Sequence, residues 1–142
     1  MPIAFIVSSF NKEVSDRLLS GALRACALKK IPKKNIEIYW VPGAFEIPVK
    51  AAQLLSKKKY QGIITLGCLI KGETDHYEYI CQGLTFGLQK VAIDYKTPVL
   101  FGVLTCRDYR HARNRSKNDT ANKGYAVTKS FFGSCVFSFE QN

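Results

Sequence analysis

The stretch GIITLGCLI, residues 62–70, decides the fold class of this 142-residue chain. Its residues are apolar or small and do not alternate with polar ones, which is typical of a strand buried on both faces. Strands of this kind occur in parallel sheets that helices cover on both sides. The segment therefore predicts a central strand of an α/β protein.

On either side of this stretch, short apolar runs alternate with longer amphipathic segments. Because crossovers between parallel strands are right-handed, few topologies remain. We predict a three-layer αβα fold with a flavodoxin-like, four-stranded parallel sheet of order 2-1-3-4. Its ligand crevice would lie beyond the carboxyl ends of the strands, at the switch point between the first and third. The other strands are expected over residues 3–8, 36–41 and 99–104, and helices over 12–29, 46–57, 75–95, 109–115 and 123–137.

The composition, with 46% hydrophobic and 23% charged residues, predicts one soluble domain over residues 1–142. No apolar run approaches the roughly 20 residues of a membrane span, and the N-terminal MPIAFIVSSFN is interpreted as a strand rather than a signal peptide. The two histidines, His76 and His111, lack the spacing of a metal site. We expect a cytoplasmic protein whose cysteines are buried thiols rather than disulfides or zinc ligands: Cys26, Cys68, Cys81, Cys106 and Cys135.

A net charge of +10 raises the question of nucleic-acid binding. The lysines within residues 29–34 and 57–59 fall at expected helix ends, where cations suit the helix dipole. Because no basic stripe is interleaved with aromatic residues, we expect no nucleic-acid partner. A last basic group follows the strand at 99–104 and either meets an anionic substrate or forms a solvated helix face: Arg107, Arg110, Arg113, Arg115 and Lys117.

Segments rich in glycine, polar and aromatic residues follow every expected strand. They are FN at 10–11, VPGAFE at 41–46, KGETDH at 71–76 and TCR at 105–107. The carboxyl ends of parallel strands share one edge of a sheet, and the opposite edge carries only lysine-rich turns. This asymmetry predicts one composite site.

The segment at 71–76 allows two interpretations. Gly72 and Thr74 suit the capping of a helix, and they also suit the binding of a phosphate at a helix N-terminus. His76, in the first helical turn, is either an ordinary surface histidine or a neutral base, since the helix N-terminus disfavours its charged form.

The other segments are equally open. Phe10 is either a core residue or a platform for a planar ring. Gly43 and Ala44 either form a plain turn or let a ligand approach the backbone closely. In the second case Glu46 would accept hydrogen bonds from hydroxyl groups of the ligand.

Taken in order, these segments resemble the lumazine synthase family. The resemblance runs from Ile3 to about Ser134 and is most specific at 41–48 and 67–79. It is carried by FN (10–11), VPGAFEIP (41–48), GCLIKGETDHYEY (67–79), PVLFGVLT (98–105), ARNR (112–115) and NKG (122–124).

The resemblance implies a cofactor-free condensation of 5-amino-6-ribitylaminouracil with 3,4-dihydroxy-2-butanone 4-phosphate. His76 would transfer protons, and Phe10 would stack on the pyrimidine. The pyrimidine and its ribityl chain would further contact Asn11, Gly43, Ala44, Phe45, Glu46, Cys68, Leu69 and Ile70. Phosphate would bind Gly72, Glu73 and Thr74. From a neighbouring subunit, Phe101 would pack on the heterocycle, Arg115 would pair with the phosphate and Lys123 would line the pyrimidine and ribityl site.

The same resemblance implies homopentamers, sometimes stacked or built into sixty-subunit shells, and leaves a complex with riboflavin synthase open. Three features depart from the family pattern. The chain begins at its first strand, residues 116–121 replace a stretch usually rich in small residues, and Ala126 stands where an acidic residue is usual. The last difference keeps a non-catalytic lumazine- or flavin-binding homologue as the alternative function.

Overall fold

The computed structural model describes residues 1–133, and its centre is a four-stranded sheet of order β2-β1-β3-β4. The strands are β1 (Ile3–Ser8), β2 (Ile36–Val41), β3 (Gly62–Ile70) and β4 (Val99–Cys106). All three neighbouring pairs run parallel. The predicted α/β class and strand order are therefore confirmed.

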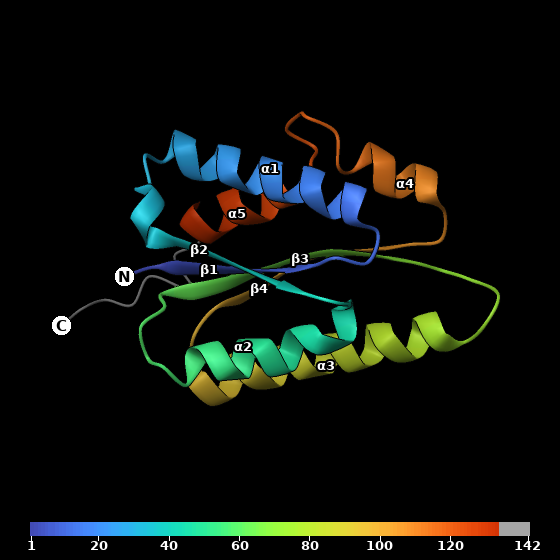
Figure 1. Cartoon of the computed structure of the whole chain (residues 1–142), viewed down its shortest axis with the longest axis horizontal. Coiled ribbons are helices and arrows are strands. Elements are labelled where there is room, and N and C mark those ends of the chain that lie inside the picture. Colours follow the sequence, from blue (N-terminus) through green and yellow to red (C-terminus); the bar gives the residue numbers. More distant parts are fainter. Residues whose placement is uncertain (134–142) are drawn as a thin grey trace.

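Helices cover both faces of the sheet (Figure 1). One layer contains α1 (Lys12–Leu28), α4 (Tyr109–Asn114) and α5 (Lys123–Gly133), and the other contains α2 (Ile47–Leu55) and α3 (His76–Tyr95). Short 3-10 turns, η1 (Lys33–Asn35) and η2 (Ala44–Glu46), precede β2 and α2. The predicted three-layer arrangement is confirmed.

Two apolar cores lie against the two faces of the sheet. In β1, Phe5 and Val7 belong to the core under α1 and α5, whereas Ala4 and Ile6 belong to the core over α2 and α3. This alternation is the two-residue period of a strand, and it requires an apolar side chain at every position. Residues 3–7 are accordingly all 0% exposed.

Element ends differ from the predictions by a few residues. β4 continues to Cys106 because Thr105 and Cys106 still pair with the end of β3. The helix predicted over 46–57 is shorter, since η2 forms its first turn and Pro48 lies at the start of α2. The helix predicted over 123–137 begins at Lys123; residues 134–137, including Cys135, lie outside the described part.

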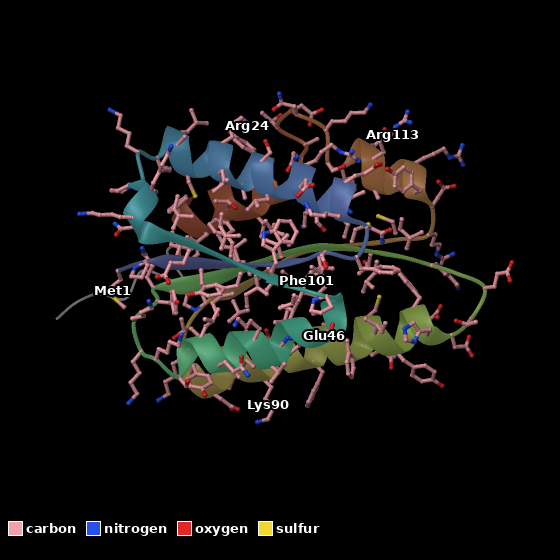
Figure 2. All side chains as sticks on the ribbon, in the orientation of Figure 1. Met1, Arg24, Glu46, Lys90, Phe101 and Arg113 are labelled. Carbon is pink, nitrogen blue, oxygen red and sulfur yellow. The ribbon has the colours of Figure 1, made fainter. Side chains whose placement is uncertain are left out.

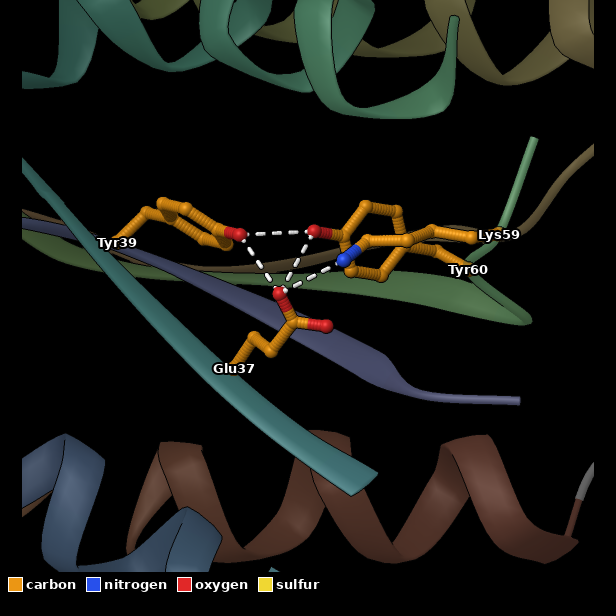
Figure 3. Close-up of polar contacts among 4 residues, drawn as sticks. All are labelled: Glu37, Tyr39, Lys59 and Tyr60. Carbon is orange, nitrogen blue, oxygen red and sulfur yellow. Dashed lines mark hydrogen bonds and ion pairs between the residues drawn. The ribbon is translucent and has the colours of Figure 1, made fainter. Parts of the chain in front are cut away.

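A polar cluster anchors the edge strand β2 to the turn that precedes β3 (Figure 3). The Tyr39 and Tyr60 hydroxyls lie 2.8 and 3.1 Å from the Glu37 carboxylate and 2.8 Å from one another. Lys59 Nζ donates to the same carboxylate oxygen at 3.1 Å. The hydrogen bond from Tyr39 is the main cause that lowers the pKa of Glu37. The cluster lies at the amino-terminal half of the sheet, away from the edge where the site is expected.

Candidate active site

A cavity of about 670 Å³ opens beyond the carboxyl ends of β1 and β3, on the face of the sheet that α2 and α3 cover. This is the switch point of the strand order, where open α/β sheets bind their ligands. The loops after β3 and β4 leave the sheet at this same end (Figure 1). The cavity is lined by Phe10, Pro42, Gly43, Ala44, Phe45, Glu46, Cys68, Leu69, Ile70, Gly72, Thr74, His76, Tyr77, Tyr79 and Ile80.

Most of the site residues predicted for a single chain therefore meet in one cavity. Asn11 does not line the cavity. Its side-chain amide donates to the Cys68 carbonyl at 3.1 Å and connects the loop after β1 to β3. Asn11 has a φ of 58°, a left-handed conformation that asparagine tolerates better than most residues. Glu73 lies on the loop after β3 but does not line the cavity.

The Phe10 side chain is 68% exposed at the mouth of the cavity. Its backbone N–H donates to the Pro42 carbonyl at 3.1 Å, which continues the pairing of β1 with β2 past the ends of both strands. The core interpretation of Phe10 is therefore wrong. A rigid aromatic ring at the mouth is suited to stacking on a planar ligand.

The segment Gly43–Glu46 forms a tight turn that presents a carboxylate. Gly43 N donates to Glu46 Oε2 at 3.0 Å, and Glu46 N donates to the Gly43 carbonyl at 3.2 Å. A Cβ atom at Gly43 would lie only 3.1 Å from Glu46 Oε2, so glycine suits this close approach. The carboxylate is exposed, and it lies in the layer of α2 and α3 (Figure 2).

The loop between β3 and α3 brings its polar residues to the N-terminus of a 20-residue helix. An ion pair of 3.0 Å between Lys71 Nζ and Glu78 Oε1 closes the base of this loop. Lys71 is also the first cause that lowers the pKa of Glu78. Thr74 Oγ1 accepts from His76 N at the long distance of 3.4 Å, and space around Gly72 is open. The loop is thus partly capped and still accessible to an anion.

His76 is the first residue of α3, is exposed and lines the cavity. Three residues of the next turn, Tyr77, Tyr79 and Ile80, line it as well, and none of them was predicted from the sequence as a site residue. The helical spacing of Tyr77 and Ile80 predicts only a core-facing side of α3, and Tyr79 is not part of that pattern. Burial is the main cause that raises the pKa of Tyr77, so its hydroxyl stays protonated near neutral pH.

The three site residues predicted to come from a neighbouring subunit also lie outside the cavity. Phe101 is on the edge strand β4 and lines a separate hollow beside α3. Arg115 follows α4 and Lys123 begins α5, so both belong to the layer on the other face of the sheet. Figure 2 shows Arg113, on α4, and Glu46 in opposite layers. A single copy of the chain therefore does not bring these residues to the cavity.

The thiol chemistry is that of buried side chains. Burial raises the pKa of Cys68, which lines the cavity, to about 12 and that of Cys26 to about 11. Both are neutral thiols near neutral pH and poor nucleophiles.

Within residues 1–133 the cysteines form no disulfide, and no group of three His, Cys, Asp or Glu side chains could hold a metal ion. No helix in that part of the chain is long and apolar enough to cross a membrane.

The fold and the cavity define an α/β protein of flavodoxin-like strand order with a small-molecule site at the carboxyl edge of its sheet. The profile of the 6,7-dimethyl-8-ribityllumazine synthase family matches residues 1–134, and the chain belongs to this family.

Curated relatives agree with the family match. The 6,7-dimethyl-8-ribityllumazine synthase of Pediococcus pentosaceus is 47% identical over 124 residues, which cover 87% of this chain and 80% of that protein. The enzyme of the same name from Coxiella burnetii is 44% identical over 122 residues, which cover 86% of this chain and 81% of that protein.

Proposed function

We propose that the protein is a 6,7-dimethyl-8-ribityllumazine synthase, a transferase of riboflavin biosynthesis. It condenses 5-amino-6-ribitylaminouracil with 3,4-dihydroxy-2-butanone 4-phosphate. The amine and the ketone form an imine, phosphate is eliminated, the ring closes and water leaves. The observation that carries the proposal is the cavity that gathers Phe10, the Gly43–Glu46 turn and His76 at the end of β3.

The cavity offers a separate place for each part of the two substrates. The Phe10 ring stacks on the pyrimidine, whose edge meets the backbone of Leu69 and Ile70. Glu46 accepts hydrogen bonds from the ribityl hydroxyls, because its carboxylate is held by Gly43 N and exposed on its other side. His76 shuttles protons between the reacting groups.

The loop of residues 72–74 receives the phosphate of the second substrate. Small residues, backbone N–H groups and the positive end of α3 meet there, and each favours an anion. The ion pair between Lys71 and Glu78 fixes the two ends of the loop. Glu73 contributes its backbone to the same loop.

A second copy of the chain completes the site in this proposal. It supplies Phe101, Arg115 and Lys123, which do not line the cavity of their own chain. An apolar stripe on α3 offers the surface for such a contact: Tyr79, Phe86 and Ile93 recur every seven residues and are 70%, 73% and 65% exposed. We propose a homopentamer, as the family resemblance implies.

We also propose that the chain is one lumazine-synthase-like domain that works in the cytoplasm. Both apolar cores lie against a single sheet, which supports one domain. Free thiols at Cys26, Cys68, Cys81 and Cys106 are typical of a reducing compartment.

Two measurements test this function together. Mixing the protein with both substrates should yield the fluorescent lumazine, and the native particle should have a mass of five times the 16.0 kDa of one chain, or a multiple of it.

The alternative, a non-catalytic lumazine- or flavin-binding homologue, is favoured by the exposed Ala126 in place of a usual acidic residue. Tight binding of lumazine without its formation would support that alternative.

Replacing Phe10 with alanine tests the stacking role. We expect the KM for the pyrimidine to rise about tenfold, since stacking on an aromatic side chain is worth ~1–3 kcal/mol. Because the ring is 68% exposed, the melting temperature should stay unchanged. Steady-state kinetics and thermal unfolding check both expectations. Leu28→Ala, a change of an equally exposed apolar side chain at the end of α1 and outside the cavity, is the control for surface effects. An unchanged pyrimidine KM in Phe10→Ala would remove the ring from the site.

A further inference from the structure

The loop that joins α4 to α5 is closed at its base. Lys123 N donates to the Arg115 carbonyl at 2.8 Å, so the residues on either side of the loop are held next to one another. Both residues carry cations that the proposed function brings into the site of a second copy. Neither cation forms an ion pair within residues 1–133.

The loop is docked on α1 by two arginines. Arg17 Nε donates to Ser116 Oγ at 3.1 Å, and Ser116 is only 1% exposed. Arg24, two helical turns further along, donates to the side chain of Asn118 and to the Asp119 carbonyl. Figure 2 places Arg24 in the same helical layer as α4 and α5. The loop therefore has a fixed position on α1.

Asn122 connects all three parts of this arrangement. Its side chain is 1% exposed, and its amide nitrogen donates to the carbonyls of Arg17 on α1, at 3.1 Å, and of Lys117 in the loop, at 3.0 Å. Its amide oxygen accepts from Tyr125 N at 3.0 Å and thereby caps α5. Every hydrogen-bonding group of this buried amide except one lone pair is used, which is the condition for a buried polar side chain to specify one geometry.

Two glycines, Gly21 and Gly124, allow the backbone to pack closely around Asn122. A Cβ atom at Gly21 would collide with the Asn122 amide, and one at Gly124 would collide with the Leu18 carbonyl. Helices α1 and α5 thus approach closely where Asn122 lies between them. A buried side chain with fixed partners on three segments holds those segments in register.

We propose that Asn122 is a positioning residue for phosphate capture: it fixes the spacing and direction of Arg115 and Lys123, which reach into the site of a second copy. This inference rests on the proposed function. Two cations held side by side repel each other, so an unclamped loop would let them separate. Burial, followed by the neighbouring Arg115 charge, lowers the pKa of Lys123, as expected for a cation close to another. The hydrogen bonds of Asn122 keep the Arg115 and Lys123 side chains close together, and two cations bind an anion more tightly than one.

The test separates positioning from helix capping. Asn122→Ser keeps an oxygen that can cap α5, since serine and asparagine are similarly good N-caps, but it cannot bridge the carbonyls of Arg17 and Lys117. Asn122→Ala removes both functions. Val127→Ala, on the same helix and 8% exposed, loosens the packing of α5 against the sheet and is the matched control for lost stability. The measurements are the KM for each substrate, the inhibition of turnover by inorganic phosphate, and the melting temperature.

We expect Asn122→Ser to lower the melting temperature no more than Val127→Ala does, because two carbonyls lose a partner while the cap of α5 is kept. It should nevertheless raise both the KM for the phosphate substrate and the inhibition constant of inorganic phosphate about tenfold. The pyrimidine KM should stay within about twofold of wild type, since its contacts are made elsewhere. Val127→Ala should lower the melting temperature and leave both KM values unchanged. Asn122→Ala should combine the two defects.

The outcomes distinguish the two proposals. A wild-type chain that forms no fluorescent product refutes the proposed function, and the positioning role falls with it. An active wild type whose Asn122→Ser variant keeps a normal phosphate KM refutes the positioning role alone. The positioning role is also refuted if Val127→Ala shows the same rise in phosphate KM, because Asn122 then acts only through stability.

Discussion

Replacing His76 with alanine is expected to lower kcat about 100-fold while both KM values stay within about threefold of wild type. Proton transfer by a positioned side chain is worth ~10²–10⁴ in rate, and an exposed site lets water take over part of the task. Because His76 lines the cavity and is exposed at the start of α3, the loss should fall at the lower end of that range.

The variant should keep measurable activity, because holding the two reactants together does not depend on the imidazole. The chain provides a matched control in its only other histidine, His111, which is exposed on α4 and does not line the cavity. Lumazine fluorescence under saturating substrates measures kcat for both variants. A His76→Ala enzyme with the turnover of His111→Ala would exclude His76 from proton transfer.

Most of the fold could be predicted because its sheet is buried on both faces. The apolar run of β3 has the predicted bounds, 62–70, since a strand covered on both sides must be apolar at every position. Helix ends were less predictable. Where α2 begins depends on the hydrogen bond between Gly43 and Glu46, a side-chain contact that periodicity does not report.

Half of the site was equally accessible to sequence reasoning. Residues after the strands of a parallel sheet must share an edge, so the loops at 10–11, 41–46, 71–76 and 105–107 were expected to meet. The first three line one cavity, and residues 105–107 do not. Periodicity could not tell how far α3 projects beyond the sheet. Tyr77 and Ile80 pack against the core and also line the cavity.

The remaining part of the site could not be predicted from local sequence patterns, for two reasons. Asn122 and Arg17 are 105 residues apart, so their hydrogen bond is a property of the folded chain alone. Arg115 belongs to a basic segment that suits a solvated helix face equally well, and it does not line the cavity of its own copy. Only the family resemblance indicated a contribution from a neighbour.

Replacing Arg115 with alanine is therefore expected to raise the KM for the phosphate substrate about 30-fold, with little change in the pyrimidine KM. Hydrogen bonds to charged groups contribute ~1.5–3 kcal/mol, and a guanidinium grips a phosphate through two of them. Arg113→Ala, two residues away on α4 and also exposed, is the control for a lost positive charge. Equal effects of the two changes would point to the general field of the basic segment rather than to a specific contact.

The His76→Ala and Arg115→Ala chains are expected to complement one another in mixed assemblies. If His76 and Arg115 of one site come from different copies, co-expressing His76→Ala with Arg115→Ala chains creates some interfaces that contain both intact residues. Random pairing in a ring gives about a quarter of the interfaces this composition, so the mixture should show about a quarter of wild-type activity at limiting phosphate substrate. Each variant alone should be far less active under the same conditions. A mixture no more active than the average of its parts would mean that both residues act within one chain, which contradicts a site shared between copies.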